Sequence, residues 1–171
     1  MQLGASNVGL SSELFSANKV LRGTDVMVNS DNVFAGYTNA SGGVGTTPCV
    51  SIYNPIGSGI TLLIDRIEFM TTQVCNVSIG MTSTLLSLPS GAWTSQKSGL
   101  TVGTCQPVKD TATPASTGYF GTYTLTANQL VIVEPPFPFL CAPGKGVLII
   151  ATNITLATAL FGNFYGREFT N

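Results

Sequence analysis

The sequence has 171 residues, of which 44% are hydrophobic and only 9% are charged, and its formal net charge at pH 7 is −1. An ordinary soluble domain carries about 25% charged residues, so much of this exterior must be neutral, built here from 37 serines and threonines. The seven scattered basic residues argue against nucleic-acid binding, and the absence of histidine removes the Ser-His-Asp and Cys-His nucleophile systems and most zinc sites.

The N-terminal part of the chain is polar. Residues 1–18 are small and hydrophilic, and we expect either an arm that ties subunits together or a frayed terminus. They lack the basic leader and the apolar core of a signal peptide, so export by the usual route is not expected. Residues 29–47 are rich in glycine, serine and threonine, which is typical of a mobile loop. Residues 19–171 suit a single domain that needs neither disulfides nor metals.

Short runs of β-branched and aromatic residues, separated by glycine, proline and asparagine, follow one another along the chain. This pattern predicts an all-β protein of eight or nine strands. The length fits a two-sheet β-sandwich or a closed β-barrel, and we favour a single jelly roll. The expected strands are residues 20–28, 48–54, 60–70, 74–81, 100–108, 118–125, 130–134, 146–152 and 158–169.

One of these strands indicates which side chains face inward. Residues 60–69 (ITLLIDRIEF) begin with both faces apolar and end with alternating polar and apolar residues. The two-residue period of a strand sets Ile67 and Phe69 on one face. Arg66 and Glu68 then lie on the other, which we expect to be wet or interfacial.

The last expected strand contains the phrase FGNFYGREF. Its period places Phe161, Tyr165 and Phe169 on the same face as Arg167, so Tyr165 and Arg167 are candidate interface residues. The glycines of this strand indicate β-bulges or a close approach of another backbone.

Residues 134–140 (EPPFPFL) form the most specific local feature of the sequence. Three prolines cannot donate backbone hydrogen bonds, so this segment should leave the sheet or run along its edge in an extended form. It would then carry Phe137 and Phe139 outward or against a neighbour. Two interpretations of this segment are open: it is a rigid crossover loop that closes one end of the barrel, or it forms a contact between subunits.

The single tryptophan is the best candidate for a sugar-binding platform. Trp93 lies in the turn-rich stretch PSGAWT, and a loop would expose its ring for stacking on a sugar. Tyrosines such as Tyr119 and Tyr123 could extend the platform, although tyrosines in β-proteins commonly pack at sheet edges with a wet hydroxyl.

No residue pattern indicates a catalytic or metal site. No two of the eight acidic residues occupy positions i and i+2 of one expected strand, so the fold would have to assemble any glycosidase pair. Residues 29–32 (NSDN) offer oxygen ligands for calcium but only one carboxylate. We therefore assign no catalytic, cofactor-binding or metal-binding residues, and expect neither enzymatic activity nor a cofactor.

Four cysteines are spread along the chain without a CxxC pair, so the spacing of a zinc site is absent. Three disulfide pairings are formally open. Because no export signal is expected, we interpret these residues as buried free thiols that act as small apolar side chains. They are Cys49, Cys75, Cys105 and Cys141.

Two turn-and-strand phrases resemble β-rich virion proteins of bacteriophages: residues 53–59 (YNPIGSG) before ITLLIDRIEF, and residues 142–150 (APGKGVLII) before FGNFYGREF. The resemblance covers residues 48–169. It is strongest to the small single-jelly-roll coat proteins of icosahedral phages with an internal membrane, followed by phage decoration and receptor-binding proteins. It implies synthesis in the host cytoplasm, a place in the virion and proximity to a membrane.

A surface with so few charges is poorly protected against self-association, because repulsion and strong hydration normally keep monomers apart. We therefore expect a structural subunit of a phage particle, a capsid or decoration protein, that forms homo-oligomers and contacts other capsid proteins. The alternative is a receptor- or carbohydrate-binding module with Trp93 in its platform. A secreted adhesin, the third hypothesis, would need disulfides.

Overall fold

The computed structural model describes residues 33–96, 102–112, 114 and 116–170. The expected arm (residues 1–18), the expected strand 20–28 and the calcium-ligand candidates at 29–32 lie outside these residues. Within them the protein is all-β, with two antiparallel six-stranded sheets and no helix. The described residues accordingly contain no helix that could cross a lipid bilayer.

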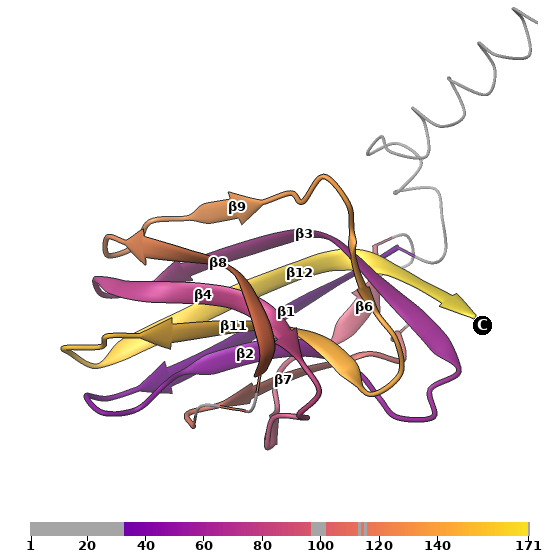
Figure 1. Ribbon diagram of the computed structural model, residues 1–171, viewed down its shortest axis with the longest axis horizontal. Helices are drawn as coiled ribbons and strands as arrows, with labels where there is room; N and C mark the ends of the chain where they lie inside the picture. Colours follow the sequence, from indigo (N-terminus) through magenta and orange to yellow (C-terminus); the bar gives the residue numbers. More distant parts are fainter. Residues whose placement is uncertain (1–32, 97–101, 113, 115, 171) are drawn as a thin grey trace, which may run out of the picture.

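The two sheets face each other as a sandwich (Figure 1). No strand pairing of the described residues joins one sheet to the other, so the arrangement is a sandwich and not a closed barrel. The first sheet has the order β10 (Phe139–Cys141), β3 (Ile60–Thr71), β12 (Thr158–Thr170), β1 (Val33–Gly42) and β6 (Trp93–Ser95), with β9 (Val131–Val133) also paired to β3. The second has the order β5 (Leu88–Pro89), β7 (Gln106–Asp110), β2 (Cys49–Asn54), β11 (Lys145–Thr152), β4 (Cys75–Thr82) and β8 (Ser116–Leu125).

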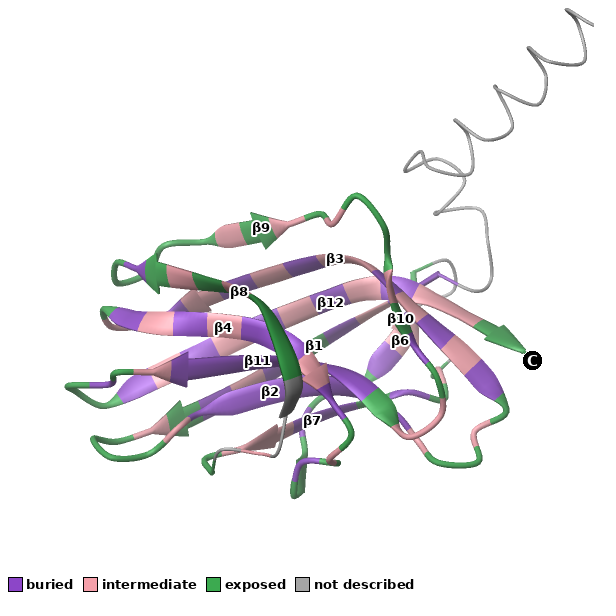
Figure 2. Cartoon of the chain, viewed as in Figure 1, coloured by how far each residue is buried: buried purple, intermediate pink, exposed green. Residues whose placement is uncertain are grey.

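The main core lies between the sheets. Buried and partly exposed residues alternate along β3 and β12, as Figure 2 shows, because successive side chains of a strand point to opposite faces. Ile67 and Phe69 are buried in this core, whereas Arg66 and Glu68 are only partly buried on the other face of β3. The expected facing of this strand is therefore confirmed.

A second, smaller core covers the outer face of the second sheet. All six residues of β2 are buried, so this strand is covered on both faces. Leu86, from the segment between β4 and β5, packs there against Tyr53, Leu148 and Ile150. The chain between β4 and β8 thus closes one outer face and also adds the short strands β5, β6 and β7 to the sheet edges.

The expectation of a mobile loop at residues 29–47 is wrong for most of its length. Residues Val33–Gly42 form β1, which pairs with β12 at every position from Val33↔Arg167 to Gly42↔Thr158. Small residues are accommodated in this strand because β12 pairs with it along its whole length and β6 pairs with Phe34–Gly36, so that neighbouring strands supply the packing volume.

The described residues contain twelve strands, more than the eight or nine expected. β9 falls within the expected strand 130–134. The strands that were not expected are β1 and three short ones, β5, β6 and β10, which have two or three residues each. Segments this short carry too little periodic signal to be recognised from sequence. The expected strand at 100–108 is observed only from Gln106, as β7.

Candidate interaction surfaces

Prolines divide one edge of the first sheet into two strands. β9 pairs with Ile67–Phe69 of β3, and β10 pairs with Leu62–Ile64 of the same strand. The intervening segment contains Pro135, Pro136 and Pro138, which have no N–H to donate to the ladder, so the chain leaves β3 between the two pairings. This confirms the prediction that the segment runs along, or departs from, a sheet edge.

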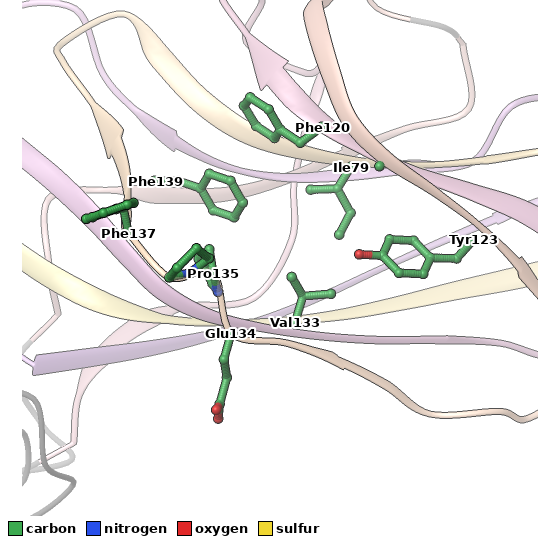
Figure 3. Close-up of a pocket in the computed structure, with 10 residues that line it drawn as sticks. Ile79, Phe120, Tyr123, Val133, Glu134, Pro135, Phe137 and Phe139 are labelled. Atoms are coloured by element: carbon green, nitrogen blue, oxygen red, sulfur yellow. The ribbon is translucent and has the colours of Figure 1, made fainter.

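The proline segment forms one wall of a groove of about 410 Å³, and β8 forms the other wall. Figure 3 shows Phe120 of β8 lying beside Phe139, and their rings stack with centroids 4.9 Å apart. Phe137 lies on the same segment and is 77% exposed. The groove is lined by Ile79, Phe120, Gly121, Tyr123, Val133, Glu134, Pro135, Pro136, Phe137 and Phe139.

A β-bulge in β3 gathers charged side chains on the outer face of the first sheet. The register between β12 and β3 shifts at Tyr165/Gly166, so that Asp65 has no partner in the ladder and both Asp65 and Arg66 are only partly buried. Arg167 of β12 then reaches Asp65 through two hydrogen bonds of 3.0 and 2.7 Å, from Nε and Nη2. This forked geometry is the strong form of an arginine–carboxylate pair.

Glu68 is the centre of the neighbouring network. Its carboxylate accepts hydrogen bonds from Asn163 at 3.2 Å, from the Tyr165 hydroxyl at 3.1 Å, and from Arg66. Burial alone would raise the pKa of Glu68, but these hydrogen bonds and the positive charge of Arg66 outweigh it and lower the pKa below its ordinary value. Burial, together with Glu68, raises the pKa of Tyr165, so its hydroxyl remains a donor.

The charged face and the apolar groove meet at Glu134. Its carboxylate lies 3.6 Å from Nη1 of Arg66 and points away from the aromatic rings of the groove (Figure 3). The structure therefore brings the predicted site residues together in two adjoining places: Phe137 and Phe139 in the groove, and Tyr165 and Arg167 on the charged face.

Trp93 lies neither in the groove nor on the charged face, and the prediction that its ring is exposed is wrong. It lies in β6 with no exposed surface and stacks on Phe34 at a centroid distance of 5.8 Å. β6 pairs with β1 at Gly36, where an added Cβ would lie 2.8 Å from Cε3 of Trp93. The indole therefore occupies the space that a side chain at Gly36 would fill, so it cannot serve as an exposed sugar platform.

Sequence reasoning missed Phe120 and the partners of Glu68. Phe120 lies in the expected strand 118–125 but directly follows Tyr119, so the two-residue period does not tell which ring faces the groove. The register shift between β4 and β8, which leaves Phe120 out of the ladder, decides it. The pairing of Glu68 with Asn163 and Tyr165 depends on the register between β3 and β12, which no local pattern encodes.

The glycines of the last strand did predict a bulge or a close backbone approach: the register shift lies at Gly166, where an added Cβ would clash with the carbonyl oxygen of Leu63. They did not indicate that Asp65 of β3 would be the residue left out of the ladder.

All four cysteines are buried and free, as expected from the sequence. Burial and the nearby Asp110 raise the pKa of the Cys49 thiol to about 12, and burial raises that of Cys141 to about 12. Within the described part of the chain, no group of three or more histidine, cysteine, aspartate or glutamate side chains is placed to hold a metal ion.

Comparisons with known proteins found no match. No protein-family model, no curated protein and no solved structure matches this chain.

Proposed function

We propose that this protein is a structural subunit of a virus particle, a bacteriophage capsid or decoration protein that assembles with copies of itself. One observation carries the proposal: large apolar side chains lie exposed along one edge of a sandwich whose sequence is only 9% charged. Exposed apolar groups gathered in this way mark interaction sites in soluble proteins. They are Tyr119, Phe120, Leu130, Ile132, Phe137 and Leu140.

The strand pairings support a jelly roll. β1 pairs with β12, β2 with β11, β3 with β9 and β10, and β4 with β8. The first four strands thus pair with the last strands in reverse order, as in one long antiparallel hairpin rolled into two sheets. Jelly rolls of this kind are common in viral capsid proteins and in lectin domains.

Assembly would be driven by burial of apolar surface, at about 25 cal/mol per Å², offset by the cost of ordering the partners. Two ion pairs of the described residues form within one chain: Arg167 with Asp65, and Arg66 with Glu68. Few charged groups would therefore need a partner across the contact. Because salt screens exposed charges and leaves apolar burial largely intact, assembly should depend weakly on ionic strength.

Native mass spectrometry and sedimentation velocity over a range of protein concentrations test the proposal, with electron microscopy to detect closed particles. We expect discrete oligomers that persist between low and moderate salt. A chain that stays monomeric at high concentration, or oligomers that dissociate in moderate salt, would contradict it. A monomer that selects particular sugars on a glycan array would instead favour the receptor- or carbohydrate-binding alternative, with a platform other than Trp93.

A further inference from the structure

We propose that the free edge of β8 pairs with β8 of a second copy around a two-fold axis, so that one sheet continues across two subunits. This inference rests on the proposed function, because it names the surface and the partner through which the subunit self-associates. Three features of β8 support it: a backbone edge without a partner among the described residues, exposed apolar side chains beside that edge, and the absence of charged residues in the strand.

The backbone of β8 is available on one side. Among the described residues β8 pairs only with β4, at the end of the second sheet. Its register shifts are confined to the half that faces Gly80–Thr82, and the half from Gly121 to Leu125 pairs with β4 without interruption. An unpaired, regular edge presents N–H and C=O groups that a further strand can use.

β8 also lacks the usual devices that prevent strand addition. Native proteins protect an edge with charged side chains, proline, a very short strand or a covering segment. The sequence of β8, STGYFGTYTL, contains no charged residue and no proline over ten residues. A bulge does bend the first half, at Phe120, so the regular half from Gly121 to Leu125 is the part suited to pairing.

The apolar side chains beside this edge supply much of the area that a dimer needs. Tyr119, Phe120 and Phe137 are 50%, 55% and 77% exposed. With about 200 Å² for an aromatic side chain, they expose about 360 Å² per copy, or about 700 Å² for two. A specific interface needs about 1,000 Å² in total, and strand pairing also buries the backbone and the remaining side chains of β8.

The chemistry of the edge favours a second copy over a charged peptide. β8 offers no charged group to pair with one, and the carboxylate that lines the groove, Glu134, lies 3.6 Å from Nη1 of Arg66. A charged partner would leave its own groups unpaired in a desolvated contact, which is costly. A two-fold contact instead places the neutral hydroxyls and aromatic rings of one copy against those of the other. An antiparallel pair of identical strands is self-complementary.

Two variants of the full chain test the inference. Phe137→Asp places a charge in the apolar contact, and Thr124→Lys brings two ammonium groups together near the two-fold axis. Matched controls lie in the turn between β1 and β2, where Val44 and Thr46 are also exposed: Val44→Asp and Thr46→Lys. Thr46, like Thr124, donates one side-chain hydrogen bond, so the two lysine variants lose a comparable contact.

Sedimentation velocity should show that each edge variant raises the dissociation constant at least about tenfold, a typical loss for an important interface residue, while the controls assemble like wild type. Thermal unfolding of all four variants establishes that they fold. Hydrogen exchange provides a second measurement: the amides of residues 121–125 that point away from β4 should become protected as the protein concentration rises.

The outcomes separate this inference from the proposed function. A wild-type chain that never assembles overturns both. An assembling chain in which folded Phe137→Asp and Thr124→Lys behave like the controls overturns only the use of β8. If the amides of residues 121–125 that point away from β4 exchange at the same rate at every concentration, the inference is also overturned, because no second strand then pairs with this edge.

Discussion

Replacing Gly36 by alanine tests the packing that buries the tryptophan. Gly36 lies in β1 opposite Trp93 of β6, and a Cβ at this position would lie 2.8 Å from Cε3 of the indole and 3.3 Å from Cγ of Pro107. Real Cβ atoms essentially never approach a carbon atom so closely, so the ring must shift. The ring has little room to do so, because it has no exposed surface and stacks on Phe34.

The expected loss combines two opposing effects. Overpacking a core costs about 1 to 3 kcal/mol. Alanine in a strand interior recovers about 0.5 to 1 kcal/mol, because glycine loses more conformational freedom on folding. Taking the middle of each range, we expect Gly36→Ala to lower the free energy of unfolding by about 1 kcal/mol. Gly118→Ala is the control, since a Cβ at Gly118 of β8 would meet nothing within 4 Å.

A double-mutant cycle identifies the indole as the cause. Urea unfolding followed by far-ultraviolet circular dichroism, at one low protein concentration, gives the free energies of wild type, Gly36→Ala, Trp93→Leu and the double variant. Because leucine removes the ring, Gly36→Ala should cost little in the Trp93→Leu background, with a coupling energy of at least about 1 kcal/mol. Additive losses, or a Gly36→Ala protein as stable as wild type, would refute the reasoning.

The ionisable groups of the protein can be tested through thiol reactivity, the pH dependence of stability and substitution of Arg167. Because the pKa values of Cys49 and Cys141 are raised to about 12, these thiols should stay neutral and resist a thiol reagent at pH 8, and all four cysteines should react only after denaturation. The pKa of Glu68 is lowered in the folded protein from its ordinary 4.5, so its stabilising effect is complete above that pH and disappears as the pH falls below it. The urea midpoint of Glu68→Gln should therefore lie below that of wild type at pH 7 and converge with it in acid; a gap that persists in acid would contradict this. Arg167→Lys, which loses the forked contact with Asp65, should cost about 0.5 to 1 kcal/mol in urea unfolding, and an unchanged midpoint would show that the pair contributes nothing.

Several features of the fold could be predicted from local sequence because their causes are local. The all-β class follows from β-branched residues in short runs, and the facing of Ile67 and Phe69 follows from the two-residue period of a strand. The break between β9 and β10 follows from prolines that cannot donate hydrogen bonds. The exposure of Phe137 was one of two outcomes left open by the same prolines.

Other features depended on which strands became neighbours. The segment of β1 resembles a loop in composition, and it is a strand because β12 and β6 supply the packing volume that its small residues lack. Trp93 lies in a turn-rich stretch, and it is buried because pairing with β1 places it over Gly36. Neither outcome can be read from residues nearby in the chain, since both are set by contacts between distant segments.

The sequence by itself determined the chemical character of this protein: a β-rich chain with a neutral exterior, four cysteines in apolar surroundings and an edge broken by prolines. Only the tertiary structure decided where these features meet. Strand register and one bulge join Asp65 to Arg167 and Glu68 to Tyr165, and the order of the strands sets β8 beside the proline segment. The physical reason is that composition and period act within a strand, whereas a surface is assembled by hydrogen-bonded pairing between strands far apart in the chain.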